Sequence, residues 1–172
     1  SPEEASTPRP SAGSIAMSVE VLAPGLCTSV QDTGRTGLRR LGVGMAGALD
    51  PHSHALANLL VGNPADAPVL EITLTGPRLR FGRAACVAVC GADVEATIDG
   101  RALPGWRPAW VPAGATLHLG ACRRGARAYL AVDGGFAPVP VLGSASTDLR
   151  GGFGGVEGRA LAAGDVLPLG EP

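Results

Sequence analysis

Residues 85–91 read ACVAVCG and residues 94–100 read VEATIDG, and these two stretches indicate the fold class more clearly than the rest of the sequence. The first is a run of small and β-branched residues, which is typical of a strand buried on both faces. The second ends in Asp99-Gly100, a pair that favours a tight hairpin turn. Together they predict β-strands joined by short turns.

Further short strands are predicted on both sides of this region. VLEITLTG at 69–76 alternates in part, and VEVLAP, just after Met17, is expected to be the first strand. Downstream, Gly or Pro bounds each of PAWVP, ATLHLG, RAYLAVDGG and DVLPLG. Strands at this spacing predict a mainly β fold, with the sheet closed into a barrel or paired in a sandwich.

One short helix is predicted, from Pro51 to about Val61. Asp50 is a favourable N-cap and Pro51 suits the first helical position, while Gly62 and the residues after it end the helix. We expect this helix to close one end of the sheet. Its predicted apolar stripe consists of Leu56, Leu59 and Leu60.

The length of 172 residues is that of one domain, and a hydrophobic fraction of 45% is enough for a packed core. Residues 1–16 are rich in Ser, Pro and Ala without a hydrophobic period, so we expect a disordered linker or tag there and a fold spanning 17–172. The 26 glycines and 15 prolines indicate many turns.

Charge and cysteine content narrow the classes of function. A net charge of -1 favours neither nucleic acid nor an anionic membrane as partner. The 14 basic residues are all Arg, which excludes Schiff-base chemistry and a P-loop lysine within this chain. Cys86 and Cys90 are about 13 Å apart on an extended strand, too far for a disulfide. With free thiols and neither a membrane span nor a signal peptide in the sequence, we expect a cytoplasmic protein.

The richest polar cluster is Gln31, Asp32 and Arg35, followed by Asp50, in a glycine-rich segment. Glycines let the backbone approach a ligand closely, and these side chains can orient it or move protons. An ordinary surface turn in which Asp32 and Arg35 form an ion pair is the alternative, and helix capping alone would explain Asp50.

Two further polar residues lie in or beside the predicted helix and strand. Asn58 falls on the helix, and Glu71 interrupts an apolar strand, where a carboxylate is either turned outward or held by a partner. His52 and His54 are about 200° apart on a helix, which is poor geometry for a shared metal. We expect no metal to be bound by this chain.

Residues 143–158 form an unusual loop, GSASTDLRGGFGGVEG. Ser146, Thr147 and Arg150 can receive carboxylate or phosphate oxygens there, together with free backbone N–H groups. A long flexible connection is the alternative. We predict that this loop and the segment of Gln31, Asp32 and Arg35 meet at one pocket mouth.

These motifs resemble, in order and approximate spacing, one family. They are PGLCTSVQDTGRTGLRRLGVGMAGALD, ANLLVGN, LEITLTGP, RAYLAVDGGF, VLGSASTDLRGGFGG and GRALAAGDVLPLG, and they run from about Met17 to Gly170. The family contains the C subunit of 5-oxoprolinase, allophanate hydrolase subunit 2, the carboxyltransferase part of urea carboxylase, and an antagonist of a sporulation kinase inhibitor. Asp133 departs from the family pattern, which has a small residue there.

The resemblance implies a cyclophilin-like β-barrel and the first of two such halves. It implies a component of an ATP-dependent hydrolase that opens 5-oxoproline to glutamate. This component would be inactive without a partner that resembles the B subunit of 5-oxoprolinase or allophanate hydrolase subunit 1. In the motif-based hypothesis Asp32, Arg35 and Asp50 are catalytic. The substrate amide and its anionic groups would be bound by Gln31, Asn58, Glu71, Ser146, Thr147 and Arg150.

Two alternatives stay open at this point. One is a biotin-dependent carboxyltransferase acting on urea, in which biotin arrives on another protein or domain because this chain has no lysine to carry it. The other is a non-catalytic protein that binds a regulatory partner. ATP would be used at the level of the complex in the leading hypothesis.

Overall fold

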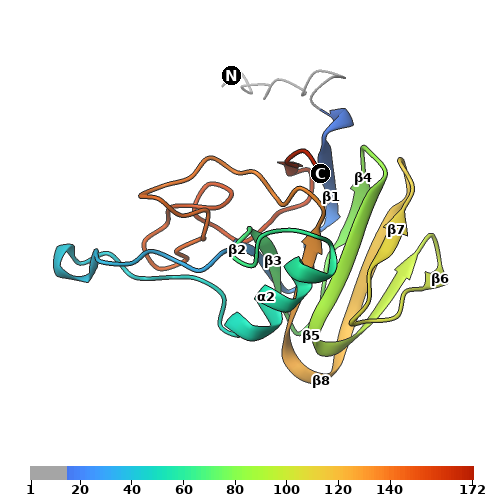
Figure 1. Ribbon diagram of the computed structural model, residues 1–172, viewed down its shortest axis with the longest axis horizontal. Helices are drawn as coiled ribbons and strands as arrows, with labels where there is room; N and C mark the ends of the chain where they lie inside the picture. Colours follow the sequence, from blue (N-terminus) through green and yellow to red (C-terminus); the bar gives the residue numbers. More distant parts are fainter. Residues whose placement is uncertain (1–14) are drawn as a thin grey trace, which may run out of the picture.

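The computed structural model describes residues 15–172, so the linker or tag predicted at 1–16 lies, apart from its last two residues, outside the described part. The predicted mainly β fold with one short α-helix is confirmed (Figure 1). A 3-10 turn, η1 (Arg39–Leu41), precedes the helix α2 (Pro51–Leu60). The strands are β1 (Ser18–Ala23), β2 (Cys27–Gln31), β3 (Val69–Thr73), β4 (Arg78–Phe81), β5 (Ala85–Ile98), β6 (Arg101–Ala102), β7 (Ala109–Val111), β8 (Thr116–Val132) and β9 (Val166–Pro168).

All nine strands belong to one curled sheet that forms a half-barrel. Its main path runs β2-β3-β8-β4-β1-β9, and β5 pairs with β8 while also carrying the short strands β6 and β7. The strands pair in antiparallel fashion, so neighbouring strands need only short connections. The long strand β8 is the centre of the sheet, because it pairs with β5 on one edge and with β3 and β4 on the other.

Strands β5 and β8 are longer than the sequence predicts. The stretches 85–91 and 94–100 are not separate strands but join into the single 14-residue β5, and ATLHLG and RAYLAV join into the 17-residue β8. Gly91, at φ 94°, is absorbed in a bulge where the register with β8 shifts, so the ladder bends and continues. The Asp99-Gly100 turn at the end of β5 is confirmed, since both residues have positive φ.

Side-chain alternation divides the sheet into two faces. One face encloses the main core, where Ile72, Phe81, Leu117 and Leu130 are fully buried together. The residues between them in sequence, such as Tyr129, point to the opposite face. This second face is the one that the helix covers.

Helix α2 lies against this second face, over β3, β5 and β8, and does not close an end of the sheet as expected. Ala57 packs there with Val69, Cys90 and Tyr129. The predicted leucine stripe is also wrong in part, because Leu59 is 59% exposed. The buried residues of the helix are smaller and more polar, which lets the helix lie close to the sheet: Ser53, His54, Ala57 and Asn58.

The outer edge of β2 is covered by the long loop region after β8. The Thr147 N–H donates to Val30 O at 2.9 Å, and the Leu161 N–H donates to Thr28 O at 2.8 Å. In Figure 1 this region, orange to red, lies beside the cyan loop that follows β2. An edge strand with occupied backbone groups is protected from pairing with another chain. None of the helices in residues 15–172 is long and apolar enough to cross a membrane.

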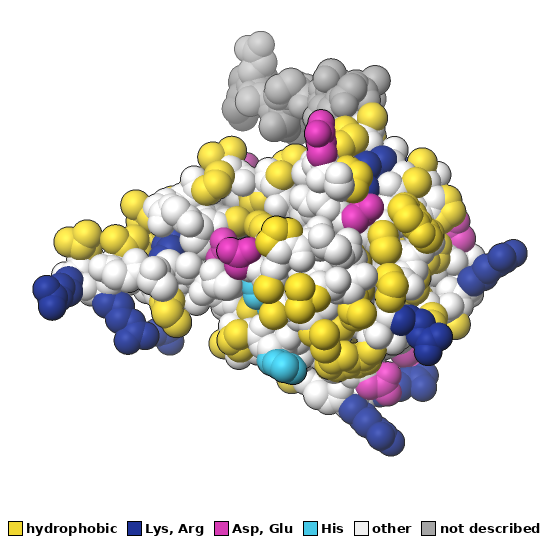
Figure 2. Space-filling view, in the orientation of Figure 1, with side chains coloured by type: hydrophobic (Ala, Val, Ile, Leu, Met, Phe, Trp, Pro, Cys, Tyr) yellow, Lys and Arg dark blue, Asp and Glu magenta, His cyan; other side chains and the backbone are white. Residues whose placement is uncertain are grey.

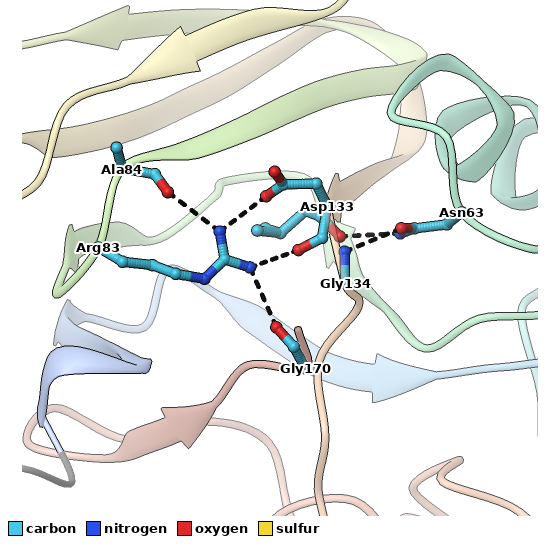
Figure 3. Close-up of polar contacts among 7 residues, drawn as sticks. Asn63, Arg83, Ala84, Asp133, Gly134 and Gly170 are labelled. Carbon is cyan, nitrogen blue, oxygen red and sulfur yellow. Dashed lines mark hydrogen bonds and ion pairs between the residues drawn. The ribbon is translucent and has the colours of Figure 1, made fainter. Parts of the chain in front are cut away.

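Arg83 joins three parts of the chain at the C-terminal side of the sheet (Figure 3). Its guanidinium donates to the Asp133 carboxylate at 2.9 Å, to the Asp133 carbonyl at 2.5 Å and to Gly170 O at 3.2 Å. The two charged side chains are only 12% and 11% exposed. Asp133 therefore has a largely enclosed ion-pair partner in Arg83.

We predict that Arg83→Gln lowers the free energy of unfolding by about 2–3 kcal/mol, because it leaves the largely enclosed Asp133 carboxylate without its cation. Chemical denaturation monitored by circular dichroism measures this change. The control is Arg80→Gln, whose pair with Glu20 is 52% and 39% exposed and should matter by less than about 0.5 kcal/mol. Equal effects of the two substitutions would contradict the assigned role of Arg83.

Candidate functional site

The Asp32 carboxylate lies at the centre of a dense polar cluster. Its Oδ1 accepts hydrogen bonds from the Ser144 and Ser146 hydroxyls, both at 2.6 Å, and from the Gly34 N–H at 2.8 Å. Its Oδ2 accepts from the Ala145 N–H at 2.8 Å. We call Asp32 with these four donors the Asp32 cluster. It joins the loop after β2 to a loop more than 100 residues later in the chain.

Hydrogen bonding decides the protonation state of Asp32. Burial raises the pKa of this carboxyl, but the hydrogen bonds from Ser144, Ser146, Gly34 and Ala145 lower it, and together they hold the pKa below its ordinary value. The group is therefore a carboxylate at neutral pH. In the predicted catalytic role it would act as an acceptor or weak base, not as a proton donor.

Arg35 is 3% exposed and is held by the same distant loop. It donates to Val141 O at 3.0 Å and to Ser146 O at 2.8 Å. The guanidinium carbon lies 4.8 Å from the centroid of the Phe153 ring, within the range of a cation–π contact. Its Nη1 is buried and has no hydrogen-bond partner in the described part of the chain.

Gln31 and Thr147 complete the junction between the two loops. The Gln31 amide donates to Ser29 Oγ at 3.0 Å and to Thr147 O at 3.1 Å, and its Oε1 accepts from the Gly47 N–H at 3.1 Å. The Thr147 hydroxyl donates to Val30 O at 3.0 Å. Both side chains are almost fully buried, so their polar groups serve mainly to join the protein to itself.

Gln31, Asp32 and Arg35 thus lie together with Ser146 and Thr147, as predicted from the sequence. They form a junction between two loops, and none of them lines the cavity beside Asp50 that is described below, so that cavity is not the predicted pocket mouth. Arg150 is separate from this group, because it is exposed on the loop that follows. Its backbone N–H donates to Asp148 Oδ1 at 3.1 Å. The functional roles assigned to these residues stay predictions.

A second polar cluster lies on the helix-covered face of the sheet, around Glu71. Glu71 is 8% exposed. Its carboxylate accepts hydrogen bonds from the Leu49 N–H at 2.8 Å and from the Tyr129 hydroxyl at 2.9 Å. The Tyr129 hydroxyl in turn accepts from the Asp50 N–H at 2.8 Å. Glu71 and Tyr129 are direct partners across β3 and β8, so the sheet register itself sets this contact.

Burial raises the pKa of Tyr129 and the nearby Glu71 carboxylate adds to this shift, so its hydroxyl keeps its proton. The result is a fixed chain of hydrogen bonds from Glu71 through Tyr129 to the backbone at Asp50. It positions the start of α2 relative to the sheet.

Asp50 performs the predicted capping and also borders a cavity. Its Oδ1 accepts from the Ser53 N–H at 3.1 Å and its Oδ2 from the Ser53 hydroxyl at 2.6 Å. These bonds are the main reason that its pKa is lowered, so this carboxyl is also ionised at neutral pH. The cavity has a volume of about 880 Å³, within the range of small-molecule sites. Its lining includes Asp50, Ser53, Asp93, Trp106, Arg124 and Arg127.

Asn58 anchors α2 to the loop that follows it. Its side-chain amide donates to Ala67 O at 2.8 Å, and the His54 ring Nε2 lies 2.8 Å from the same carbonyl. Asn63 donates to the Asn58 side chain at 3.1 Å and to Val132 O at 2.8 Å. Asn58 is fully buried in this network. Within residues 15–172, no three His, Cys, Asp or Glu side chains lie close enough together to hold a metal ion.

Sequence reasoning missed two contributors to these clusters, Ser144 and Tyr129. Ser144 lies only two residues before Ser146, in the loop already singled out for its hydroxyls. Tyr129 is the one tyrosine of the chain, within an apolar strand, where a hydroxyl needs a partner. That signal, combined with Glu71 in another apolar strand, could have indicated the pair.

Residues 41–172 match the model of the family described as carboxyltransferase domain, subdomain A and B. The chain belongs to this carboxyltransferase family. It is 47% identical over 154 residues to the C subunit of 5-oxoprolinase from Escherichia coli K12, covering 89% of this chain and 49% of that protein. It is 43% identical over 152 residues to urea amidolyase of Saccharomyces cerevisiae, covering 88% of this chain and 8% of that protein.

Solved structures agree with this assignment. The crystal structure of Kluyveromyces lactis urea carboxylase matches with a TM-score of 0.88 and 45% identity, over 91% of this chain and 14% of that one. This carboxyltransferase-family chain thus spans about half the length of the bacterial relative and a small part of the fungal ones. The family resemblance inferred from the six motifs is confirmed by these matches.

For the Asp32 cluster we predict that Asp32→Asn lowers the free energy of unfolding by about 3 kcal/mol at pH 7, because an amide NH₂ cannot accept from all four donors. The folded-state pKa of Asp32 lies below the ordinary value of 3.8. Its contribution is therefore fully present above pH 3.8 and is lost as the pH falls through the folded-state pKa.

Urea denaturation of both proteins from about pH 7 down to about pH 3 measures this dependence. The difference between wild type and Asp32→Asn should narrow at the acid end. Asp66→Asn, at an exposed carboxylate, is the control and should change stability by less than about 0.5 kcal/mol. A difference that stays constant with pH would show that the charge of Asp32 contributes nothing.

Proposed function

We propose that this chain is part of one component of an ATP-dependent amide hydrolase of the 5-oxoprolinase type, which opens 5-oxoproline to glutamate in the cytoplasm. The observation that carries the proposal is the 47% identity to the C subunit of E. coli 5-oxoprolinase over 89% of the chain. The chain covers 49% of that relative, so turnover is expected only with the remaining half. A partner that resembles the B subunit of 5-oxoprolinase or allophanate hydrolase subunit 1 is also required.

The polar groups at the cavity fit an amide substrate. Amide chemistry needs an acceptor for the N–H and donors for the oxygen on which negative charge develops. Asp50 supplies an ionised carboxylate at the cavity wall, and Ser53 lies beside it. The bonds from Glu71 through Tyr129 fix the backbone that carries Asp50. We infer that Asp50 faces the substrate, while Asp32 and Arg35 hold the surrounding loops in place.

A carboxyltransferase component of a biotin-dependent urea carboxylase is the second candidate. The observation in its favour is the TM-score of 0.88 and 45% identity to the K. lactis urea carboxylase. Biotin would then arrive on another domain, because this chain contains no lysine to which it could be attached. In that reaction the cavity would accept urea.

Assays of the assembled complex separate the two candidates. With ATP and 5-oxoproline, the first predicts glutamate release; with ATP, bicarbonate, urea and a biotinylated partner, the second predicts urea-dependent ATP hydrolysis. Residues 1–172 alone are expected to be inactive in both assays. If the complex releases no glutamate but hydrolyses ATP in a urea-dependent way, the second candidate replaces the first.

Asp50→Ser tests the role given to the cavity carboxylate. Serine is as good an N-cap as aspartate, so the helix should be kept while the charge is removed. We expect kcat of the assembled complex to fall by about 100-fold or more, with an unchanged melting temperature. Asp66→Ser, at an exposed position outside the cavity, is the control. Unchanged kcat in Asp50→Ser would remove Asp50 from the reaction.

A further inference from the structure

The cavity beside Asp50 has a second wall built from the bent parts of β5 and β8. The register of the two strands shifts between Gly91 and Asp93 and again before Val94, at positions that line the cavity. Bulges bend a strand and redirect its side chains, and they are frequent beside binding sites. In Figure 2 basic and acidic side chains gather at the end of the molecule where β5 and β8 bend.

Arg127 reaches this wall with an incompletely bonded guanidinium. Its ion-pair partner is Glu71, whose Oε1 lies 3.9 Å from the Arg127 Nε, which is too long for a hydrogen bond. This Nε is buried and has no hydrogen-bond partner among residues 15–172. A buried donor of this kind is costly unless another acceptor reaches it. The Nε faces Glu71 inside the protein, so a ligand in the cavity would instead meet the Nη groups, which have no hydrogen-bond partner among residues 15–172 on a side chain that is 34% exposed.

Arg124 lines the same cavity three residues earlier on β8. It lies opposite Asp93 in the ladder, yet the two side chains form no ion pair in the described structure. Its sequence neighbour Arg123, in contrast, forms an ion pair with Glu95 and does not line the cavity. The two adjacent arginines therefore have different surroundings, and Arg124 is the one available to a ligand in the cavity.

Trp106 forms an apolar part of the lining. It has φ 62°, a conformation that is strained for a bulky residue, and its backbone N–H donates to Val89 O at 2.8 Å. The residue is nevertheless 49% exposed. Backbone strain at a partly exposed aromatic residue is a feature of binding sites, where the rest of the fold holds the residue in place.

We propose that Arg124 and Arg127 form an anion-recognising subsite, which makes this cavity select small amides that carry a carboxylate. Two planar guanidinium groups with unused donors match the geometry of a carboxylate. Trp106 would cover the carbon skeleton of the ligand, and the opposite wall with Asp50 would receive its N–H group. The choice of an amide as the rest of the ligand depends on the proposed function, whereas the anion subsite does not.

The acidic residues near the cavity do not cancel this subsite. Asp50 accepts from Ser53 and keeps acceptor capacity for the ligand N–H, and Glu71 accepts from Leu49 and Tyr129. Asp93 also lines the cavity, opposite Arg124 in the ladder, but the two side chains are not within ion-pair distance in the described structure. The guanidinium groups of Arg124 and Arg127 therefore keep donors that an anion can use. Urea has no carboxylate, so this wall favours a carboxylated lactam over urea as ligand.

Intrinsic fluorescence can measure binding without turnover. Trp106 and Trp110 are the two tryptophans of this chain, so Trp110→Phe leaves Trp106 as its one reporter. The same complex with both tryptophans replaced by Phe gives the emission of the other parts of the complex, which is subtracted. We expect 5-oxoproline to change this emission in a saturable way in the assembled complex. The neutral lactam 2-pyrrolidinone, which lacks the carboxylate, and urea should bind at least about tenfold more weakly.

Arg124→Gln in the Trp110→Phe background should weaken 5-oxoproline binding by at least about tenfold and leave 2-pyrrolidinone binding unchanged. Arg124 is exposed in the structure, so this variant is expected to fold. Arg127→Gln should have the same effect, with its melting temperature measured because Glu71 loses a nearby cation. Arg123→Gln is the matched control and should bind 5-oxoproline as the parent does.

The outcomes separate this inference from the proposed function. Equal binding of 5-oxoproline and 2-pyrrolidinone, or of 5-oxoproline by Arg124→Gln and Arg123→Gln, would overturn the anion subsite even if the complex releases glutamate. Arginine-dependent binding of 5-oxoproline without glutamate release would support the subsite and refute the proposed reaction. No binding of 5-oxoproline to the parent complex would overturn the subsite directly.

Discussion

The rest of this structure depends on the hydrogen bonds that the ionised carboxylate of Asp32 accepts. It accepts three hydrogen bonds from a loop more than 100 residues away and a fourth from Gly34, and the distant loop also covers the free edge of β2. Without that charge, the donors of Ser144, Ala145 and Ser146 would be enclosed and unpaired. The fold therefore holds its loop-rich half with a half-buried anion, together with apolar residues of that half, such as Ala145 and Leu161, that join the main core.

The other half depends on side-chain alternation in the sheet. Neighbouring residues of β8 point to opposite faces, so Leu130 enters the main core while Tyr129 lies under the helix. The register between β3 and β8 places Glu71 opposite Tyr129. A polar cluster and an apolar core are thus built from the same strands, and the polar cluster reaches the cavity through Asp50.

Much of this arrangement was predictable. The strand runs, the Asp99-Gly100 turn, the Asp50 cap and the meeting of Gln31, Asp32 and Arg35 with Ser146 and Thr147 were all expected from the sequence, and all are present. The position of the helix was not predicted, because hydrophobicity favours Leu59 as a buried residue. Close packing on the sheet instead selects the small face with Ala57 and the hydrogen bonds of Asn58.

The sequence by itself determined the class of fold and the family, because glycine, proline and alternating apolar residues act locally and the six motifs keep their order. Tertiary structure alone decided which polar side chains bind other groups of the chain and which remain free to bind a ligand. Arg123 and Arg124 are identical neighbours in the sequence, yet one pairs with Glu95 and the other lines a cavity. That difference arises from the bulged register of two long strands, and a register is a relation between distant segments that local patterns do not contain.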